Sequence, residues 1–356
     1  MTGAALQRTW WRPRVTAVAA LLLPLSWVFG ALAALRRRAY RAGWLHRTRL
    51  PVPVVIVGNI AVGGAGKTPL VAALVAALRE RGLHPGIVSR GHGRVDGAVR
   101  IVRPQDHPRD VGDEPLILAA GGVPVCVGRR RVAAGQALLA AHPEVDVIVS
   151  DDGLQHYALE RDFEIAVVDA ARGVGNGLLL PAGPLREPVA RLASVDAVVE
   201  LRDSAAAPVA TRAGIASRNV HPMSQEPQAW RNVADPGRIV DSARLRGPDV
   251  VAIAGIGNPQ RFFDLIARLG IDARTQAFDD HHEYRRSEVA FPGASAILMT
   301  EKDAVKCREF SDPRMWMLPI RASVAPALID AIVEKLRGPQ APRNARVPGD
   351  QGPAHL

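Results

Sequence analysis

A glycine-rich segment near residue 60 carries a lysine and a threonine in an order that suits phosphate binding. It ends in Gly66-Lys67-Thr68, follows an apolar run at 54–57 and precedes an alanine- and leucine-rich stretch at 70–78. This order of strand, loop and helix lets backbone N–H groups and a helix N-terminus converge on phosphate oxygens. Lysine is rare, with four in the chain, so Lys67 is informative. Lys67 would reach the β- and γ-phosphates of a nucleotide, and Thr68 would ligate Mg²⁺.

The loop departs from the G-x-x-x-x-G-K-[ST] pattern at its first position, which is Ala61. Two glycines lie inside the loop instead, and Pro69 suits the first turn of the following helix. A glycine-rich turn without a ligand is the alternative interpretation, but the flanks and the final triplet favour a nucleotide site. The predicted ATP-binding residues are Gly63, Gly64, Ala65, Gly66, Lys67 and Thr68.

Two neighbouring carboxylates, Asp151 and Asp152, end a second apolar run at 145–149. In a parallel sheet the carboxyl ends of the strands open onto the same edge as the phosphate loop. The two acids could therefore hold Mg²⁺ against the nucleotide. An exposed Asp-Gly turn is the competing interpretation, and the upstream glycine loop favours the metal.

Four further segments carry polar groups that are ambiguous in isolation. Acids at the start of a predicted helix can simply stabilise its dipole, and a histidine pair without further ligand spacing is weak support for zinc. The segments are Gly112-Asp113-Glu114-Pro115, Pro181-Ala-Gly-Pro-Leu-Arg186-Glu187, Asp280-His281-His282 and Thr300-Glu-Lys302-Asp303-Ala-Val-Lys306.

Strand-like and helix-like runs alternate along the chain, which is typical of a parallel α/β sheet covered on both faces. We predict a P-loop NTPase-like domain at 41–202 and a smaller α/β domain at 248–337 that closes over the active site. Residues 203–247 hold several prolines and little periodicity, and are expected to connect the two. The tail at 338–356 has a composition typical of disorder.

The N-terminal segment, 1–40, is expected to associate with a membrane. Residues 15–35 form an uncharged run of 21 residues, which as a helix would be about 30 Å long and could cross a bilayer. A signal peptide cleaved after 31–33 and a helix lying in the interface are alternatives. Positive charge follows the run directly, which argues against export. The flanking arginines are Arg8, Arg12, Arg14, Arg36, Arg37, Arg38, Arg41, Arg47 and Arg49.

Overall composition narrows the class of partner. The net charge is +10, which favours anionic partners, but much of it surrounds the N-terminal apolar run. Aromatic residues are few and are not interleaved with the arginines, so nucleic acid is not an expected partner. The two cysteines are too few for a disulfide framework or a zinc site. The sequence indicates no oligomeric state.

Taken together, the motifs resemble one family, the tetraacyldisaccharide 4′-kinases, which are the lipid A kinases of Gram-negative bacteria. The resemblance covers roughly residues 15–335, and the family's phosphate loop also lacks the first glycine. The matching motifs, in order, are Val57-Gly-Asn-Ile-Ala-Val-Gly-Gly-Ala-Gly-Lys-Thr-Pro69, Ser89-Arg-Gly91, Val111-Gly-Asp-Glu-Pro115, Asp151-Asp-Gly-Leu-Gln-His156, Leu180-Pro-Ala-Gly-Pro-Leu-Arg-Glu187, Asp280-His281-His282 and Thr300-Glu-Lys-Asp-Ala-Val-Lys306.

The resemblance implies transfer of the γ-phosphoryl group of ATP to the 4′-hydroxyl of a tetraacyl glucosamine disaccharide 1-phosphate. It implies an enzyme at the inner membrane with its catalytic domains on the cytoplasmic face. Asp113 would be the catalytic aspartate, with His281 as its partner across the interdomain cleft. The other implied residues are Asp151, Asp152, Thr68 and Glu187 near Mg²⁺, and Gln155, His156 and Arg186 in support of the site or the substrate.

Two other functions compete with this prediction. A membrane-tethered P-loop ATPase that energises a transporter would explain residues 15–170, but it gives no use to the Asp280-His281-His282 segment. A cytosolic small-molecule ligase of the same fold would not explain the arginine-flanked apolar run.

Overall fold

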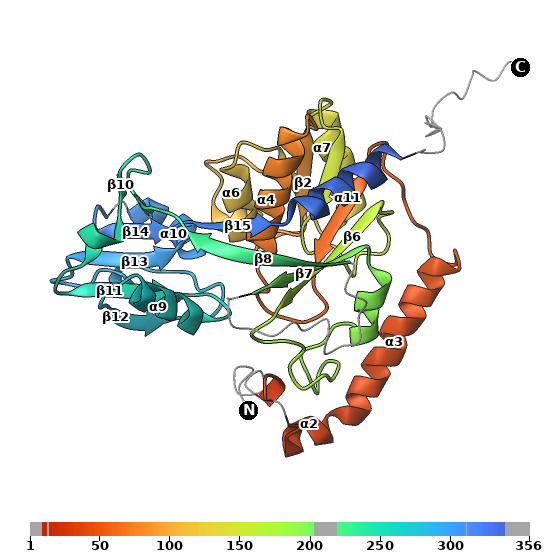
Figure 1. The fold of residues 1–356 in the computed structure, drawn as a ribbon, viewed down its shortest axis with the longest axis horizontal. Helices are drawn as coiled ribbons and strands as arrows, with labels where there is room; N and C mark the ends of the chain where they lie inside the picture. The colour runs from red at the N-terminus through yellow and green to blue at the C-terminus, as the bar shows by residue number, and fades with distance from the viewer. Residues whose placement is uncertain (1–8, 13, 203–218, 311, 339–356) are drawn as a thin grey trace, which may run out of the picture.

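The computed structural model describes residues 9–12, 14–202, 219–310 and 312–338. The chain forms two α/β units that lie side by side, with helix α3 along the outer edge of the larger one (Figure 1). The α-helices include α2 (Ala17–Leu21), α3 (Leu23–Arg41), α4 (Lys67–Glu80), α5 (Pro108–Val111), α6 (Asp113–Ala119), α7 (Arg131–Ala141), α9 (Pro259–Arg268), α10 (Glu301–Cys307) and α11 (Pro326–Arg337).

A nine-stranded sheet is the framework of the larger unit. Its order is β15-β8-β7-β6-β1-β5-β2-β4-β3, parallel except for the two edge strands β15 and β3. Helices α4, α6 and α11 pack on one face and α7 on the other, so the central strands are buried on both sides. Its strands are β1 (Val54–Gly58), β2 (Pro85–Ser89), β3 (Arg100–Ile101), β4 (Val125–Val127), β5 (Val147–Ser150), β6 (Phe163–Asp169), β7 (Ala197–Leu201), β8 (Val220–Pro227) and β15 (Ile320–Val324).

Strands β1 and β5 lie side by side and in parallel, with Val55 opposite Val149. The loop after β1 and the acids after β5 therefore meet at one edge of the sheet, as the sequence predicts. The first strand ends beside the acidic loop: a Cβ at Gly58 would lie 2.6 Å from the Cβ of Leu154. A side chain at that position would push the two loops apart.

The smaller unit has a six-stranded sheet in the order β10-β9-β14-β13-β11-β12. Helix α9 packs on one face and α10 on the other. Its strands are β9 (Trp230–Asn232), β10 (Ile239–Val240), β11 (Val250–Ala254), β12 (Arg274–Ala277), β13 (Ala296–Thr300) and β14 (Met315–Leu318).

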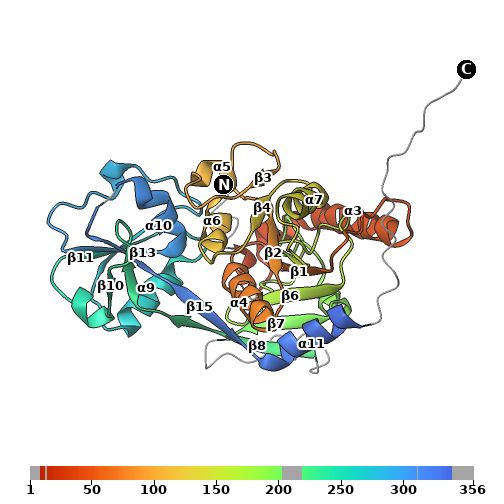
Figure 2. The same ribbon diagram turned by 90° about the horizontal axis from the view of Figure 1, so that it is seen from above.

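A ribbon of two antiparallel strands, β8 and β15, joins the two units (Figure 2). This differs from the predicted boundaries, because β8 and β15 extend the larger sheet and α11 packs into its core. The expected linker, 203–247, thus includes one strand of the larger sheet and two of the smaller. Residues 203–218 and the expected disordered tail beyond 338 lie outside the described residues.

The uncharged run at 15–35 does not form the single membrane-associated helix that the sequence predicts. The run is divided between α2 and α3, which meet at Leu22, and α3 continues through the arginines to Arg41. Among the described residues, no helix is both long and apolar enough to cross a membrane.

Candidate active site

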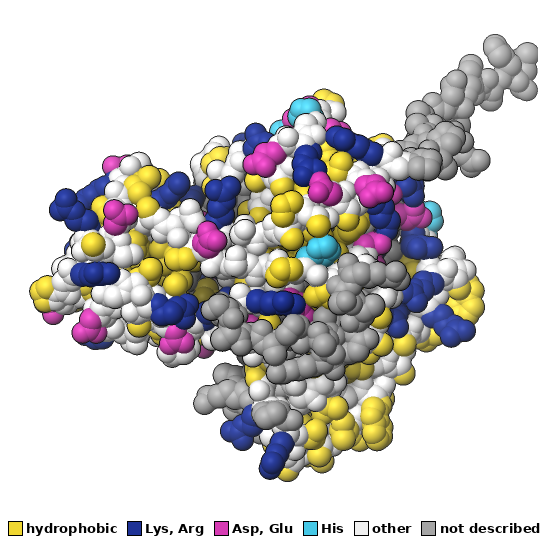
Figure 3. Space-filling view, viewed as in Figure 1, with side chains coloured by type: hydrophobic (Ala, Val, Ile, Leu, Met, Phe, Trp, Pro, Cys, Tyr) yellow, Lys and Arg dark blue, Asp and Glu magenta, His cyan; other side chains and the backbone are white. Residues whose placement is uncertain are grey.

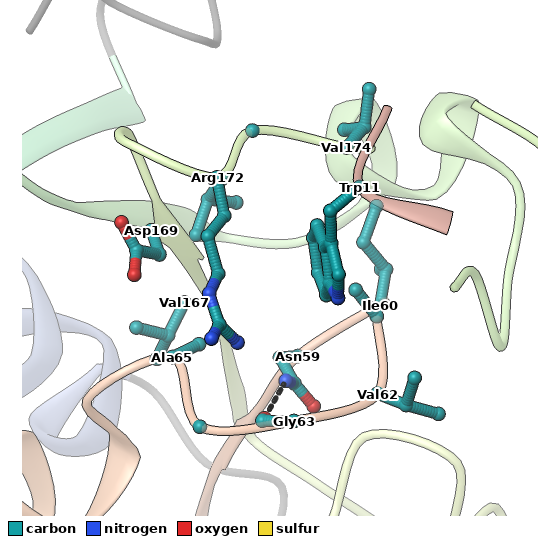
Figure 4. A pocket seen from close by; sticks show the side chains of 14 residues that line it. Trp11, Asn59, Ile60, Val62, Gly63, Ala65, Val167, Asp169, Arg172 and Val174 are labelled. Carbon is teal, nitrogen blue, oxygen red and sulfur yellow. Dashed lines mark hydrogen bonds between the residues drawn. The ribbon is translucent and has the colours of Figure 1, made fainter. Parts of the chain in front are cut away.

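The phosphate loop runs from Asn59 to the start of α4 at Lys67. Gly66 immediately precedes the helix with a φ of +81°, a conformation that L-residues with side chains rarely adopt. A Cβ there would also lie 3.0 Å from Nε2 of Gln225. The side-chain amide of Asn59 donates to the carbonyl oxygen of Gly63 at 3.2 Å and ties the loop to its own strand (Figure 4).

Three charged side chains meet below this loop. The ammonium group of Lys67 lies 3.3 Å from Asp152, and the guanidinium of Arg186 lies 3.2 Å from the same carboxylate. Burial alone would raise the pKa of Asp152, but the two cations lower it to about 2. Asp152 also adopts a φ of +46°, so the turn aims its carboxylate at the loop under backbone strain. The arrangement neutralises the charge of Lys67 at the first residue of α4.

Asp151 is buried beside Asp152, and burial raises its pKa. One carboxylate oxygen accepts a hydrogen bond from Ser89 at 3.2 Å, while the other has no hydrogen-bond partner. A buried carboxylate oxygen without a partner is unfavourable unless something binds it. Together with the buried hydroxyl group of Thr68, it supplies the hard oxygen ligands that Mg²⁺ prefers.

Glu187, predicted as a further metal ligand, is already occupied by protein groups. Its carboxylate accepts a hydrogen bond from the hydroxyl of Tyr157 and pairs with Nε of Arg191 at 3.1 Å. Within the described ranges, no three histidine, cysteine or acidic side chains gather as a metal cluster. Glu187 is therefore held in place by Tyr157 and Arg191.

Asp113 and His281 come from different units and meet across the cleft between them. Nδ1 of His281 lies 3.1 Å from Oδ2 of Asp113. Burial acts to raise the pKa of Asp113, but the hydrogen bond to His281 and the charge of Lys302 bring it down to about 2. In return, the hydrogen bond to Asp113 raises the pKa of His281. His281 has a φ of +61°, so the histidine too is held in a rarely populated conformation.

A cavity of about 160 Å³ opens beside this pair. The ring of His92 packs against that of His281 at a tilt of 53° with centroids 4.8 Å apart, and burial lowers the pKa of His92. Charged groups from both units line the remaining wall. The Asp113–His281 pair therefore lies in the wall of an open cavity.

The predicted supporting residues contact the phosphate loop and the acids. The amide of Gln155 donates to the carbonyl oxygen of Asn59 at 3.0 Å. Nε2 of His156 accepts from the backbone N–H of Arg131 at 3.3 Å, and burial lowers the pKa of His156 to about 4. Both side chains therefore brace the loops that carry the charged groups.

Sequence reasoning missed Arg131, which lies buried beneath the acids. Its guanidinium donates to the carbonyl oxygen of Asp151 at 3.1 Å and to that of Gly128 at 3.0 Å. Its only sequence signal is its place as the first residue of the helix at 131–141, where a positive charge is unfavourable for the helix dipole. That unfavourable position could have singled out Arg131 in the sequence.

A second set of missed residues surrounds the outside of the phosphate loop. The guanidinium of Arg172 lies 5.0 Å from the ring centroid of Trp11 and donates to the carbonyl oxygen of Gly257 at 3.0 Å (Figure 4). Nearby, Arg261 of the smaller unit pairs with Asp169 at 3.6 Å. These contacts join the N-terminal segment, the phosphate loop and the smaller unit. They depend on side chains far apart in sequence, so no local pattern indicates them.

Comparison with known proteins agrees with this geometry. A family model described as tetraacyldisaccharide-1-P 4′-kinase matches residues 18–337. A tetraacyldisaccharide 4′-kinase of Dechloromonas aromatica is 51% identical over 344 residues, covering 96% of this chain and 99% of the relative. One of Azoarcus sp. is 52% identical over 336 residues, covering 94% of this chain and 96% of the relative.

A solved structure is also similar over most of the chain. It is that of LpxK from Aquifex aeolicus in complex with ATP, with a TM-score of 0.76 and 27% identity. The match covers 90% of this chain and 99% of that chain. From the family model, the extended identity to its members and the shared fold, the chain belongs to the tetraacyldisaccharide-1-P 4′-kinase family.

Proposed function

We propose that Asp113 and His281 act together as the proton acceptor in the phosphorylation of a lipid hydroxyl. As a member of its family, the chain is an ATP-dependent kinase that acts on the 4′-hydroxyl of a tetraacyl disaccharide 1-phosphate in lipid A biosynthesis. The observation that carries the proposal is the 3.1 Å contact between Nδ1 of His281 and Oδ2 of Asp113 across the two units. A transporter-coupled ATPase gives this pair no use.

Phosphoryl transfer requires mainly alignment and charge neutralisation, because the transition state spreads charge over the equatorial phosphate oxygens. On the donor side, the loop N–H groups and Lys67 would hold the β- and γ-phosphates. Asp152, which pairs with Lys67 at 3.3 Å, would release it when the triphosphate competes for its charge. Arg186 remains beside Asp152 and keeps that carboxylate ionised.

On the acceptor side, the substrate hydroxyl would enter the cavity beside Asp113. The attacking oxygen forms a bond to the γ-phosphorus while the bond to the β–γ bridging oxygen breaks, and the hydroxyl proton passes to Asp113. His281 stabilises the ionised carboxylate and orients it. Because the two groups are coupled, the pair titrates as a unit. The pair also requires both units to be in contact, so chemistry would occur only when the domains are closed.

Thr68, Asp151 and Asp152 would hold Mg²⁺, and the partnerless oxygen of Asp151 fits a hard cation there. When bound, the metal would neutralise phosphate charge and align the transferred group. The protein groups around it are set by Ser89 and Arg131, which fix the side chain and the backbone of Asp151.

The proposal predicts transfer of radiolabel from γ-labelled ATP to a tetraacyl disaccharide 1-phosphate in detergent micelles. We expect product with Mg²⁺ and none with excess EDTA, and recovery when Mg²⁺ is restored. Removal of the 4′-hydroxyl from the acceptor should abolish the product. Nucleotide hydrolysis at full rate without any lipid product would contradict the proposal.

We further propose that α3 places the enzyme on a membrane surface. Five apolar side chains at spacings of three and four residues form one stripe along α2 and α3, and each is more than half exposed. Such a stripe on a surface helix is typical of an interfacial anchor. Figure 3 places hydrophobic side chains on this edge of the molecule. The stripe consists of Leu21, Leu25, Val28, Leu32 and Leu35.

The opposite face of α3 is fastened to the larger unit. The hydroxyl of Ser26 donates to the carbonyl oxygen of Leu179 and accepts from the backbone N–H of Ala182 at 3.3 Å. Gly30, one turn later, allows close approach, because a Cβ there would lie 2.7 Å from Leu179. The helix therefore turns Ser26 and Gly30 toward the larger unit and the apolar stripe away from it. The arginines that follow the stripe, Arg36, Arg37 and Arg38, would add electrostatic attraction to anionic headgroups.

Replacing Leu25 and Leu32 together by glutamate is expected to abolish co-sedimentation with vesicles that contain anionic lipid. Each exposed apolar side chain contributes to insertion, and two charges on the stripe oppose it. Val95→Glu is the matched control, because Val95 is 86% exposed but lies away from α3. ATP binding should be retained in both variants. Unchanged sedimentation of the double variant would rule out the stripe as an anchor.

A further inference from the structure

Lys306 is a buried cation whose role the family assignment leaves open. Its side chain is 8% exposed, and its ammonium group has no hydrogen-bond partner. A buried ammonium is costly unless nearby charges compensate it. The group must therefore be explained by its charged neighbours.

Two carboxylates from different units flank this ammonium. It lies 3.9 Å from Oδ2 of Asp113 in the larger unit and 3.5 Å from Oδ1 of Asp303 in its own. The oxygen that it approaches on Asp113 is the one that contacts Nδ1 of His281. Tyr284 lies on the other side, with its ring centroid 5.4 Å from the ammonium. Lys306 thus faces the same carboxylate oxygen as the histidine.

The smaller unit fixes Asp303 independently of Lys306. Asp303 is fully buried and accepts hydrogen bonds from the hydroxyl of Tyr284 at 2.8 Å and that of Thr300 at 2.6 Å. It also accepts one from the backbone N–H of Gly255 at 3.1 Å. The carbonyl oxygen of Gly255 in turn accepts from the N–H of His281 at 3.2 Å. One rigid network therefore supports both the histidine and the lysine.

Lys302, one helical turn earlier on α10, makes a different contact. It pairs with Glu114 and is 26% exposed, so solvent screens it more than Lys306. Both lysines face the acids at the start of α6. Lys306 lies within ion-pair distance of a carboxylate of each unit, so when the two units separate it loses the compensating charge of Asp113 and keeps that of Asp303.

We infer that Lys306 is a positioning residue for phosphoryl transfer: it holds the Asp113 carboxylate toward His281 and keeps it ionised when the domains close. The inference rests on the proposed role of Asp113 and His281. Its physical basis is that a cation near both groups favours loss of a proton from each. Other charged or titratable groups around Asp113 act at the same time; they are Lys302, Glu114, His92, Asp280 and His281.

Lys306→Met tests the inference, because methionine keeps much of the apolar stem and removes the charge. We expect kcat for the lipid acceptor to fall on the order of 10- to 100-fold with little change in the KM for ATP. Removing a cation raises the pKa of Asp113 and of His281, so the pair loses its proton only at higher pH. The ratio of kcat in the unmodified enzyme to kcat in Lys306→Met should therefore increase as the pH falls. Lys306→Arg should restore part of kcat and flatten that dependence.

Lys335→Met is the matched control, since Lys335 pairs with Asp196 on the surface, away from both carboxylates. A second measurement does not depend on turnover: the His281 imidazole is titrated by NMR in the full-length protein. We expect a higher His281 pKa in Lys306→Met and no change in Lys335→Met. An unchanged His281 titration, or a kcat deficit of equal size at every pH, would overturn the inference. If the unmodified enzyme makes no lipid product but Lys306→Met still raises the His281 pKa, the proposed phosphorylation would be contradicted and the effect of Lys306 on the pair would stand.

Discussion

Asp113→Asn is expected to lower kcat for the lipid acceptor by about 10²- to 10⁴-fold, the range that a positioned general base contributes. Asparagine keeps the size of the side chain but cannot take a proton from the hydroxyl. ATP binding should persist, because Asp113 lies at the start of α6 and the phosphate loop precedes α4. The measurement is a steady-state assay with labelled ATP, together with equilibrium binding of a non-hydrolysable analogue.

His281→Gln is the informative companion of this variant. Glutamine can still donate a hydrogen bond toward Asp113 but carries no charge, so we expect a smaller loss than in Asp113→Asn. The double variant should be little worse than Asp113→Asn, because the two groups act as one unit. Turnover of Asp113→Asn within a factor of three of the unmodified enzyme would exclude Asp113 as the proton acceptor.

The donor half of the site could be predicted from sequence because its signals are local. An apolar strand, a glycine turn and a helix follow each other directly, and the observed strand and helix, β1 and α4, begin where that order places them. The acids after β5 belong to the same edge because parallel strands impose it. Chain geometry alone brings Lys67 and Asp152 to 3.3 Å.

The acceptor half could not be derived in this way. Asp113 and His281 are 168 residues apart, and only the family resemblance paired them. The strands that set the two units together, β8 and β15, lack the continuous apolar runs of central strands. Strand β8 reads Val-His-Pro-Met-Ser-Gln-Glu-Pro and is mostly half-exposed. The composition of this segment therefore indicated a linker, whereas in the structure it forms a strand by pairing with β7 and β15.

The N-terminal run was predicted to form one membrane-associated helix. Its 21 uncharged residues would be long enough to cross a bilayer as a single helix. In the structure the run breaks at Leu22, and Ser26 is buried against the larger unit. Ser26 contacts the larger unit, while Leu21, Leu25, Val28, Leu32 and Leu35 are more than half exposed. The spacing of these five residues by three and four positions marks the exposed face in the sequence.

Helix α3 also reaches the loops of the candidate site, which connects the exposed apolar stripe to the site. Arg36 donates to the carbonyl oxygen of Gln155 at 3.1 Å, and its guanidinium lies 5.9 Å from the ring centroid of Tyr157. Tyr157 in turn holds Glu187. A helix seated on lipid would thus be in direct contact with the loop beside Asp151 and Asp152.

Lys67→Met is expected to reduce kcat/KM for ATP by about 10²- to 10³-fold or more, comparable to the loss of one preorganised charge-stabilising group. The side chain is 11% exposed, so its charge acts at low effective dielectric. In the proposed mechanism Lys67 leaves Asp152 for the transferred phosphoryl group, whereas Arg186 stays paired with Asp152. Steady-state kinetics over a range of ATP concentrations provide the measurement.

Lys67→Arg separates charge from geometry. Arginine restores the positive charge, but its planar guanidinium is longer and cannot fit the same point beneath the loop, so we expect little recovery. Asp152→Asn should have a smaller effect on ATP binding than Lys67→Met, since it frees Lys67 from its 3.3 Å ion pair while weakening the proposed metal site. Excess Mg²⁺ should then rescue Asp152→Asn in part and Lys67→Met not at all. Equal rescue of both variants by Mg²⁺ would show that Lys67 serves only to balance Asp152, and that another group stabilises the transferred phosphate.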